Sequence, residues 1–160
     1  LAIQFLLKKV ASDNVKVTLI CSPEKYAKLD KLIDKSKLKG WIDYTKDQDF
    51  PDLQADVLMD LVGDDAGVRA LSTLKSVGRV KVLPTIWVDK LKAAGSNKSL
   101  SVDGYAVKPN GEDMAKVLQD VADGTLILKI QQTYPLSEVV TAHRELEKGD
   151  TFGKIVLKAS

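Results

Sequence analysis

Patterns typical of β-strands alternate with patterns typical of α-helices along most of this 160-residue chain. Short apolar runs at residues 15–21, 55–61 and 79–83 predict buried strands, and helical patterns lie between them. Neighbouring parallel strands need a long crossover connection, and a helix is the usual one. The alternation therefore predicts an α/β fold with a mostly parallel, doubly wound sheet and helices on both of its faces.

The expected helices have recognisable starts and apolar stripes. Asn110 precedes a segment in which apolar residues recur at helical spacing, at Met114, Val117, Leu118 and Val121. The further expected helices lie at residues 1–11, 23–37, 64–74 and 136–148, and the further strands at 40–44, 99–107, 125–130 and 153–158. Residues 84–98 have no clear pattern, so an irregular connection is expected there.

The composition is that of an ordinary globular chain, with 44% hydrophobic and 29% charged residues. The net charge of +2 gives no argument for nucleic acid as a partner. The single cysteine, Cys21, excludes an internal disulfide and suits a reducing compartment, so we expect a cytoplasmic protein. No apolar run approaches the roughly 20 residues of a membrane span.

The glycine motifs that bind phosphate groups are missing from this sequence. Its ten glycines form neither G-x-G-x-x-G nor a P-loop. In a Rossmann domain such glycines let the backbone approach the pyrophosphate between the first strand and the first helix. The sequence opens on the helix-like stretch LAIQFLLKKVA. We therefore expect the first strand and its glycine-rich turn to be lacking.

The strand at residues 15–21 is followed by Ser22 rather than by an acid. An NAD site usually has Asp or Glu at the end of its second strand, whereas an NADP site avoids that acid to accommodate the 2′-phosphate. Ser22 offers a hydroxyl and Lys25 an ammonium. The same residues also fit an ordinary helix start with an exposed Lys25, and Glu24 argues mildly against a phosphate. Both interpretations stay open on the residues alone.

His143 is the single histidine, and it falls on the helix stripe of Val139, Val140 and Leu146. A buried side chain bonded to the backbone is therefore expected. One histidine and one cysteine cannot assemble a zinc site within the chain, so no metal is expected. Neither a Ser-His-Asp arrangement nor a carboxylate pair stands out, and we assign no catalytic residue.

The end of the chain carries the most specific pattern, YPLSEVVTAHRELEKGDTFGKIVL at residues 134–157. It resembles the C-terminal signature of the medium-chain dehydrogenase/reductase superfamily, and more narrowly its zinc-independent quinone and enone reductases. Four earlier segments are similar to the family's pattern and occur in the same order: LAIQFLLKK, GWIDYTKDQDF, ADVLMDLVGDD and LKSVGRVKVL. The resemblance covers essentially the whole chain, but the family's glycine turn and N-terminal substrate domain are missing.

The resemblance implies a Rossmann-like NAD(P)-binding domain at residues 1–133, incomplete at its N-terminus. Residues 134–160 would form a helix and strand that return toward the missing substrate domain. The implied cofactor is NADPH, with Ser22 and Lys25 at its 2′-phosphate and Tyr44 near that phosphate and the adenosine. The residues that the resemblance places at the cofactor are Ser22, Lys25, Tyr44, Val62, Gly63, Leu83, Pro84 and Lys154.

Three functions are considered for a chain with this pattern. The first is the cofactor-binding portion of an NADPH-dependent oxidoreductase that reduces quinones or enones by hydride transfer, with the 160-residue chain inactive alone. The second is a non-catalytic Rossmann-type interaction module related to these reductases. The third is a methyltransferase, against which the C-terminal signature argues. Strand edges left without a neighbour would also permit a homodimer.

Overall fold

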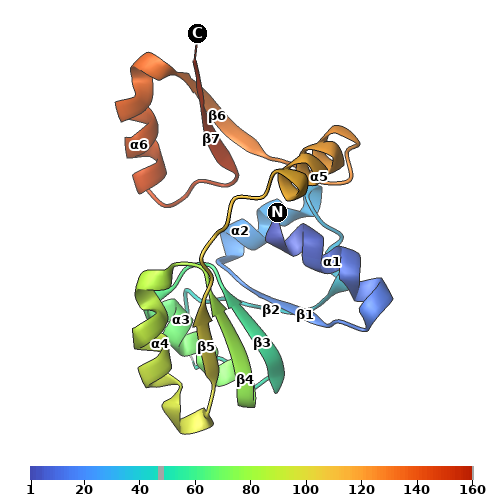
Figure 1. The fold of residues 1–160 in the computed structure, drawn as a ribbon, viewed down its shortest axis with the longest axis vertical. Helices are drawn as coiled ribbons and strands as arrows, with labels where there is room; N and C mark the ends of the chain where they lie inside the picture. The colour runs from blue at the N-terminus through green and yellow to red at the C-terminus, as the bar shows by residue number, and fades with distance from the viewer. Residues whose placement is uncertain (47–48, 160) are drawn as a thin grey trace. The chain divides into compact units, whose positions relative to one another are not determined.

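The computed structural model describes residues 1–46 and 49–159. The chain divides into two compact units (Figure 1). Residues Ile42–Pro109 form one of them, called here the central unit. Leu1–Trp41 and Asn110–Ser160 together form the other, called the terminal unit. Across the described residues, seven strands form three hydrogen-bonded sheets.

The central unit is built on a parallel three-stranded sheet in the order β3-β4-β5. Its strands are β3 (Ala55–Asp60), β4 (Leu74–Val82) and β5 (Ser101–Gly104). The connections hold helices α3 (Asp64–Ala70) and α4 (Val88–Ala94), which lie side by side (Figure 1). Short 3₁₀ turns complete the connections at Leu71–Thr73, Thr85–Trp87 and Ser96–Lys98. This strand-helix-strand order explains the parallel pairing.

One face of this sheet carries the core of the central unit. Val80 lies opposite Leu58 on β3 and Val102 on β5, so all three side chains share a face. Helix residues of α3 and α4 cover that face, and Leu91 of α4 is completely buried. The core cluster consists of Leu71, Leu74, Val80, Val82, Leu91 and Val102.

The terminal unit contains two further small sheets. β1 (Val17–Ile20) pairs with β2 (Leu38–Ile42), and β6 (Ile130–Pro135) pairs in parallel with β7 (Lys154–Lys158). Its helices are α1 (Ala2–Asp13), α2 (Pro23–Ala27), α5 (Gly111–Ala122) and α6 (Val139–Glu147). Its 3₁₀ turns lie at Lys28–Lys31, Lys35–Lys37 and Leu136–Glu138. Helix α6 connects β6 to β7, as expected for a parallel pair.

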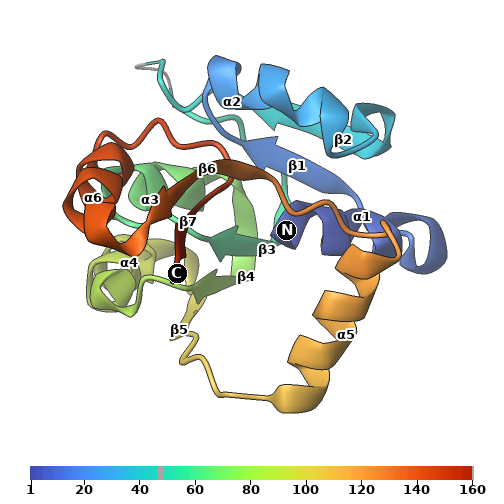
Figure 2. The ribbon, with the colours of Figure 1, turned by 90° about the horizontal axis from the view of Figure 1, so that it is seen from above.

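Helix α1 lies beside the segment that enters β6 (Figure 2), and the Gln4 side chain ties the two together. The side-chain amide of Gln4 donates to the Ile127 carbonyl at 3.0 Å, and its side-chain oxygen accepts from the Ile127 N–H at 2.8 Å. Gln4 is only 8% exposed. A buried amide that satisfies both backbone groups of one residue fixes these two segments against each other.

The prediction of an α/β fold with parallel strands is confirmed, but three local predictions were wrong. The α-helix expected at residues 23–37 ends at Ala27 and passes into the 3₁₀ turn at Lys28–Lys31, and a second 3₁₀ turn begins after Asp34, whose side chain accepts from the Ser36 N–H. Residues 88–94, expected to be irregular, form α4 around the buried Leu91. The strand expected at 125–130 begins only at Ile130, because the N–H groups of Leu126 and Ile127 bond to Asp120 and Gln4 instead.

Two further observations concern side chains and helix length. His143 is exposed on α6, so the expected burial was wrong, and Val140 and Leu146 beside it are also more than half exposed. Among the described residues, no helix has both the length and the apolar character that a membrane crossing needs.

Candidate functional site

The carboxyl ends of β3 and β4 meet at one edge of the central sheet. The Leu83 N–H donates to the Asp60 carbonyl at 2.9 Å, which joins the first residue after β4 to the last residue of β3. The side chains of Val62 and Leu83 are 68% and 42% exposed. Ligands of open parallel sheets bind outside the carboxyl ends of the strands. Four expected residues therefore lie together at such an edge: Val62, Gly63, Leu83 and Pro84.

The turn that follows β3 depends on glycine. Gly63 has φ 79° and ψ −158°, a conformation that side-chain-bearing residues essentially avoid. A Cβ added to Gly63 would lie 2.1 Å from Cδ1 of Trp87, so the indole packs where a side chain would otherwise sit. The next residue, Asp64, also has a positive φ of 53°. This backbone is held in place by its surroundings rather than by its own preference.

Two carboxylates at the start of α3 share one cation. Lys90 Nζ lies 2.6 Å from Asp64 Oδ1 and 2.8 Å from Asp65 Oδ1. The Lys90 ammonium, first by hydrogen bonding and then by its charge, holds the pKa of Asp65 below its ordinary value. Hydrogen bonds to the two carboxylates raise the pKa of Lys90. The start of α3 is thus acidic and does not attract a phosphate group.

Ser22 and Lys25 lie together in the terminal unit, at the end of β1. Ser22 is the N-cap of α2, and its Oγ accepts from the Lys25 N–H at 3.3 Å. Lys25 Nζ donates to the Gly149 carbonyl at 3.3 Å. The hydroxyl of Ser22 can still donate its own hydrogen. The expected helix start at Ser22 is confirmed, but Lys25 is partly buried rather than exposed. The hydrogen of the Ser22 hydroxyl and two hydrogens of the Lys25 ammonium remain available to a ligand.

Aromatic residues brace the same strand end. Trp41 Nε1 donates to the Cys21 carbonyl at 3.0 Å, directly before Ser22. The rings of Tyr26 and Trp41 stack with centroids 4.4 Å apart and planes inclined by 9°. Lys35 Nζ lies 4.2 Å from the Tyr26 ring centroid. The backbone at Cys21-Ser22 is therefore held from the neighbouring strand as well as from α2.

Tyr44 belongs to the central unit, whereas Ser22 and Lys25 belong to the terminal unit. The Tyr44 side chain is partly buried, and its carbonyl accepts from Arg69 Nη1 at 3.0 Å. The Arg69 guanidinium also lies 4.5 Å from the Phe50 ring centroid. Arg69 of α3 therefore fixes the backbone at Tyr44.

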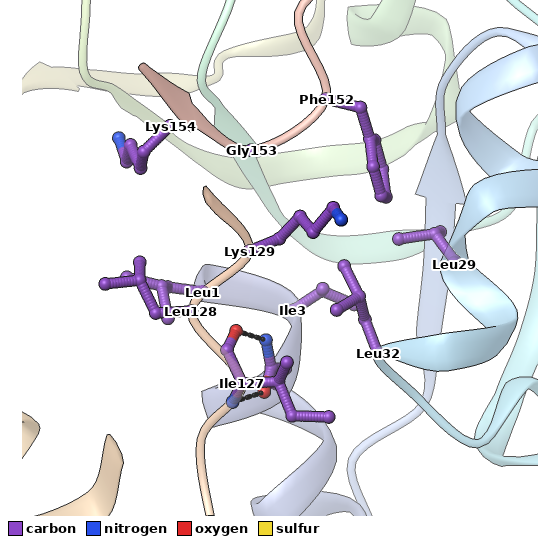
Figure 3. Close-up of a pocket in the computed structure, with 11 residues that line it drawn as sticks. Leu1, Ile3, Leu29, Leu32, Ile127, Leu128, Lys129, Phe152, Gly153 and Lys154 are labelled. Atoms are coloured by element: carbon purple, nitrogen blue, oxygen red, sulfur yellow. Dashed lines mark hydrogen bonds between the residues drawn. The ribbon is translucent and has the colours of Figure 1, made fainter. Parts of the chain in front are cut away.

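Lys154 lines a cavity in the terminal unit (Figure 3), and neither Ser22 nor Lys25 is among the residues that line it. The cavity measures about 260 Å³, and its lining combines apolar side chains with Gln4, Lys129 and Lys154. Lys129 extends across it toward Phe152, and the Lys154 N–H donates to the Lys129 carbonyl at 2.9 Å. Ligand pockets for drug-sized molecules usually measure about 300–1,000 Å³. The cavity is therefore too small for a whole dinucleotide.

Sequence reasoning missed two residues of the central edge, Asp60 and Trp87. Asp60 Oδ1 accepts from the N–H groups of Val62 and Gly63, at 3.0 and 2.8 Å. The signal was available in the sequence, because an aspartate at a strand end often bonds to the backbone two residues on. Trp87 could not be found in this way, since its contact with Gly63 bridges residues far apart in the chain.

A family model described as zinc-binding dehydrogenase matches residues 37–157. A quinone oxidoreductase from Coxiella burnetii is 25% identical, with a TM-score of 0.76 over 98% of this chain and 58% of that one. An NAD-dependent alcohol dehydrogenase is 21% identical, with a TM-score of 0.65 over 100% of this chain and 57% of that one. A comparison with curated proteins gave no match.

A cobalt- and zinc-bound thermostable alcohol dehydrogenase from Pyrobaculum aerophilum is 18% identical, with a TM-score of 0.63 over 98% of this chain and 54% of that one. This likeness shows the fold alone. Residues 1–46 and 49–159 contain no group of three or more His, Cys, Asp or Glu side chains that could hold a metal ion. The described part of the chain therefore does not fit a zinc site, although the family description names the metal.

The chain spans about 58% of the Coxiella burnetii enzyme's length. The likeness to that enzyme confirms the Rossmann-like fold that the sequence predicted, with parallel sheets and helices. The family model covers most of the chain, including the C-terminal signature on which the resemblance was based. The chain therefore belongs to the zinc-binding dehydrogenase family and represents the C-terminal, cofactor-binding portion of a medium-chain dehydrogenase/reductase.

Proposed function

We propose that this chain is the cofactor-binding portion of an NADPH-dependent oxidoreductase that reduces quinones or enones by hydride transfer. The observation that carries the proposal is the family match over residues 37–157, together with the likeness to a quinone oxidoreductase over 98% of the chain. The bound nicotinamide supplies the hydride. The side chains of this chain bind and orient it, and none of them is assigned as a catalytic residue.

Ser22 and Lys25 are proposed to hold the 2′-phosphate of NADPH. The strand end before them carries no acid that would repel this phosphate. The Ser22 hydroxyl can donate one hydrogen bond, and the Lys25 ammonium can donate more than the single bond to Gly149. Tyr44, whose backbone Arg69 holds, is proposed to lie near the adenosine.

The edge at β3 and β4 is proposed to bind the nicotinamide and its ribose. Val62 and Leu83 present exposed apolar side chains there, whereas Pro84 is partly buried and Gly63 is buried against Trp87. Two carboxylates begin the neighbouring α3, and the single ammonium of Lys90 neutralises only one of their two charges. An uncharged ligand group suits this environment better than a phosphate does. Lys154 is also proposed to contact the cofactor, and this proposal rests only on the family resemblance.

Two structural proposals accompany this function. Residues 134–160 are proposed to pack against a substrate domain outside the 160 residues. A homodimer is proposed because β6 and β7 form a sheet of only two strands, which is marginal by itself. Light scattering on the full-length protein tests the dimer.

A non-catalytic module is the second candidate, and a specific observation favours it. The Ser22 Oγ and Lys25 Nζ already have partners within the chain. Such a module would keep the fold while binding the dinucleotide weakly or not at all.

Equilibrium titration of the full-length natural protein separates the two candidates. Nicotinamide fluorescence is followed while NADPH, and separately NADH, is titrated. The proposal expects saturable binding of both, with NADPH at least about tenfold tighter, as one extra charge-assisted contact provides. Absence of saturable binding of either nucleotide supports the non-catalytic module.

A further inference from the structure

The carboxylate of Asp60 is buried beneath the turn that follows β3. Asp60 is 6% exposed, and Oδ1 accepts two backbone N–H groups, from Val62 at 3.0 Å and from Gly63 at 2.8 Å. Oδ2 is also buried and has no hydrogen-bond partner among the residues that the structure describes. Leaving a buried carboxylate oxygen without a partner costs free energy, so this arrangement needs a reason.

The oxygen without a partner lies directly against α3. A Cβ added to Gly67 would come within 2.5 Å of Asp60 Oδ2, so the carboxylate fits only because residue 67 has no side chain. Gly67 has no positive φ that would require glycine for its own conformation. The glycine is therefore explained by the space that the Asp60 carboxylate needs.

The turn above Asp60 cannot hold its conformation alone. Gly63 and Asp64 have successive positive φ values of 79° and 53°. The Trp87 ring packs on one side of Gly63, and the Asp60 carboxylate binds its N–H. Charge-assisted hydrogen bonds from two consecutive N–H groups to one oxygen fix the direction of the peptide planes at Val62 and Gly63.

We infer that Asp60 is a positioning residue, which sets the backbone of the Val62–Gly63 turn at the candidate cofactor edge. The inference rests on the proposed function in one respect, since the turn is proposed to face the nicotinamide. Asp60 itself is buried beneath the turn. It acts through the two amides that it binds, with Gly67 as the residue that leaves it room.

Three variants of the full-length protein test this inference. Asp60→Ala removes the acceptor, Asp60→Asn keeps an acceptor oxygen of the same shape, and Gly67→Ala displaces the carboxylate while leaving it in the chain. Asp52→Ala is the matched control for an aspartate, because Asp52 caps an exposed turn at Gln54. Gly111→Ala is the matched control for a helical glycine, because nothing lies within 4 Å of its Cβ position.

Two measurements are made on every variant. Hydrogen exchange of the Val62 and Gly63 amides reports the turn without any cofactor. Titration with NADPH and with NADH reports binding. We expect Asp60→Ala and Gly67→Ala to speed exchange at both amides and to weaken both nucleotides equally, by about tenfold. Asp60→Asn should retain slow exchange and stay within about twofold in affinity.

The outcomes separate the inference from the proposed function. Two results for a folded Asp60→Ala or Gly67→Ala protein would overturn the positioning role. The first is unchanged hydrogen exchange at the Val62 and Gly63 amides. The second is faster exchange at these amides with unchanged affinity for both nucleotides. If Asp60→Ala does not fold, the hydrogen exchange and nucleotide affinity of Gly67→Ala and Asp60→Asn decide whether Asp60 has the positioning role. If the wild-type protein binds neither nucleotide, the proposed function fails and the cofactor role of Asp60 fails with it. The exchange data would then still decide whether Asp60 fixes the turn.

Discussion

The Leu83 N–H donates a 2.9 Å hydrogen bond to the Asp60 carbonyl, and this bond joins the carboxyl ends of two parallel strands. It continues the β3–β4 pairing by one step beyond the partners Asp60 and Val82. The residues that follow each strand, Val62 with Gly63 and Leu83 with Pro84, consequently emerge at one edge. Strand pairing thus determines where the candidate nicotinamide site lies.

Replacing Lys25 tests the choice of cofactor. If Lys25 holds the 2′-phosphate, Lys25→Ala should weaken NADPH by about 1.5–3 kcal/mol and leave NADH nearly unchanged, because NADH lacks this phosphate. Fluorescence titration with both nucleotides measures the difference. Lys31→Ala, at an exposed position in the 3₁₀ turn after α2, is the matched control. Equal weakening of both nucleotides would remove the phosphate assignment.

Replacing Gly63 tests the strained turn. Gly63→Ala places a Cβ 2.1 Å from the Trp87 ring and forces alanine to a φ of 79°. We expect a loss of at least about 2 kcal/mol in the free energy of unfolding, measured by urea denaturation. Gly111→Ala, which meets no atom within 4 Å, should change stability little. Equal stability of the two variants would show that the Gly63 backbone carries no strain.

Leu91 tests the core of the central unit. It is completely buried against the sheet face formed by Val80, Val82 and Val102. Leu91→Ala should lower the free energy of unfolding by about 2–5 kcal/mol, because it removes buried apolar surface and leaves a cavity. Ile86→Ala, at a side chain that is 82% exposed, should stay within about 0.5 kcal/mol. A small effect at Leu91 would mean that α4 does not pack on this face.

The ion pair between Lys90 and Asp65 predicts how stability depends on pH. The pKa of Asp65 is lowered in the folded state, so its contribution is complete above the ordinary value of 3.8 and is lost as the pH falls through the lowered one. The pKa of Lys90 is raised, so its contribution is present below 10.5 and is lost as the pH rises through the raised value.

In the Lys90→Met variant, the free energy of unfolding should therefore depend less on pH, both in the acid range and in the alkaline range. Chemical denaturation repeated across the acid and alkaline ranges measures these slopes. Asp65→Asn serves as the comparison in acid, because it removes the titrating group and keeps the shape of the side chain. Slopes in Lys90→Met that match the wild-type protein at both extremes would contradict the ion-pair account.

The sequence predicted the elements whose apolar pattern is decided locally. β3 and α5 were found at nearly their observed bounds because their patterns are regular and their ends are marked, by Asn110 in the case of α5. Helix α4 was missed because Leu91 is its only fully buried residue, which leaves little periodicity to detect. The start of β6 was displaced because Gln4, more than 120 residues away in the chain, takes the backbone groups of Ile127.

The candidate site was predictable to the same extent. Val62 and Gly63 could be named from their place after a strand, as the carboxyl end of a parallel strand is a usual ligand site. The support beneath them could not be named, because Asp60 and Gly67 matter only once α3 folds back onto the end of β3. The contact between Gly63 and Trp87 likewise exists only in the folded central unit.

The central claim is tested most directly by NADPH oxidation in the full-length natural protein with a simple quinone such as 1,4-benzoquinone. The account predicts quinone-dependent loss of NADPH absorbance that is clearly faster than with NADH, and that falls in Lys25→Ala with NADPH but not with NADH. NADPH oxidation no faster than in protein-free controls, under conditions where the protein is folded, would contradict it.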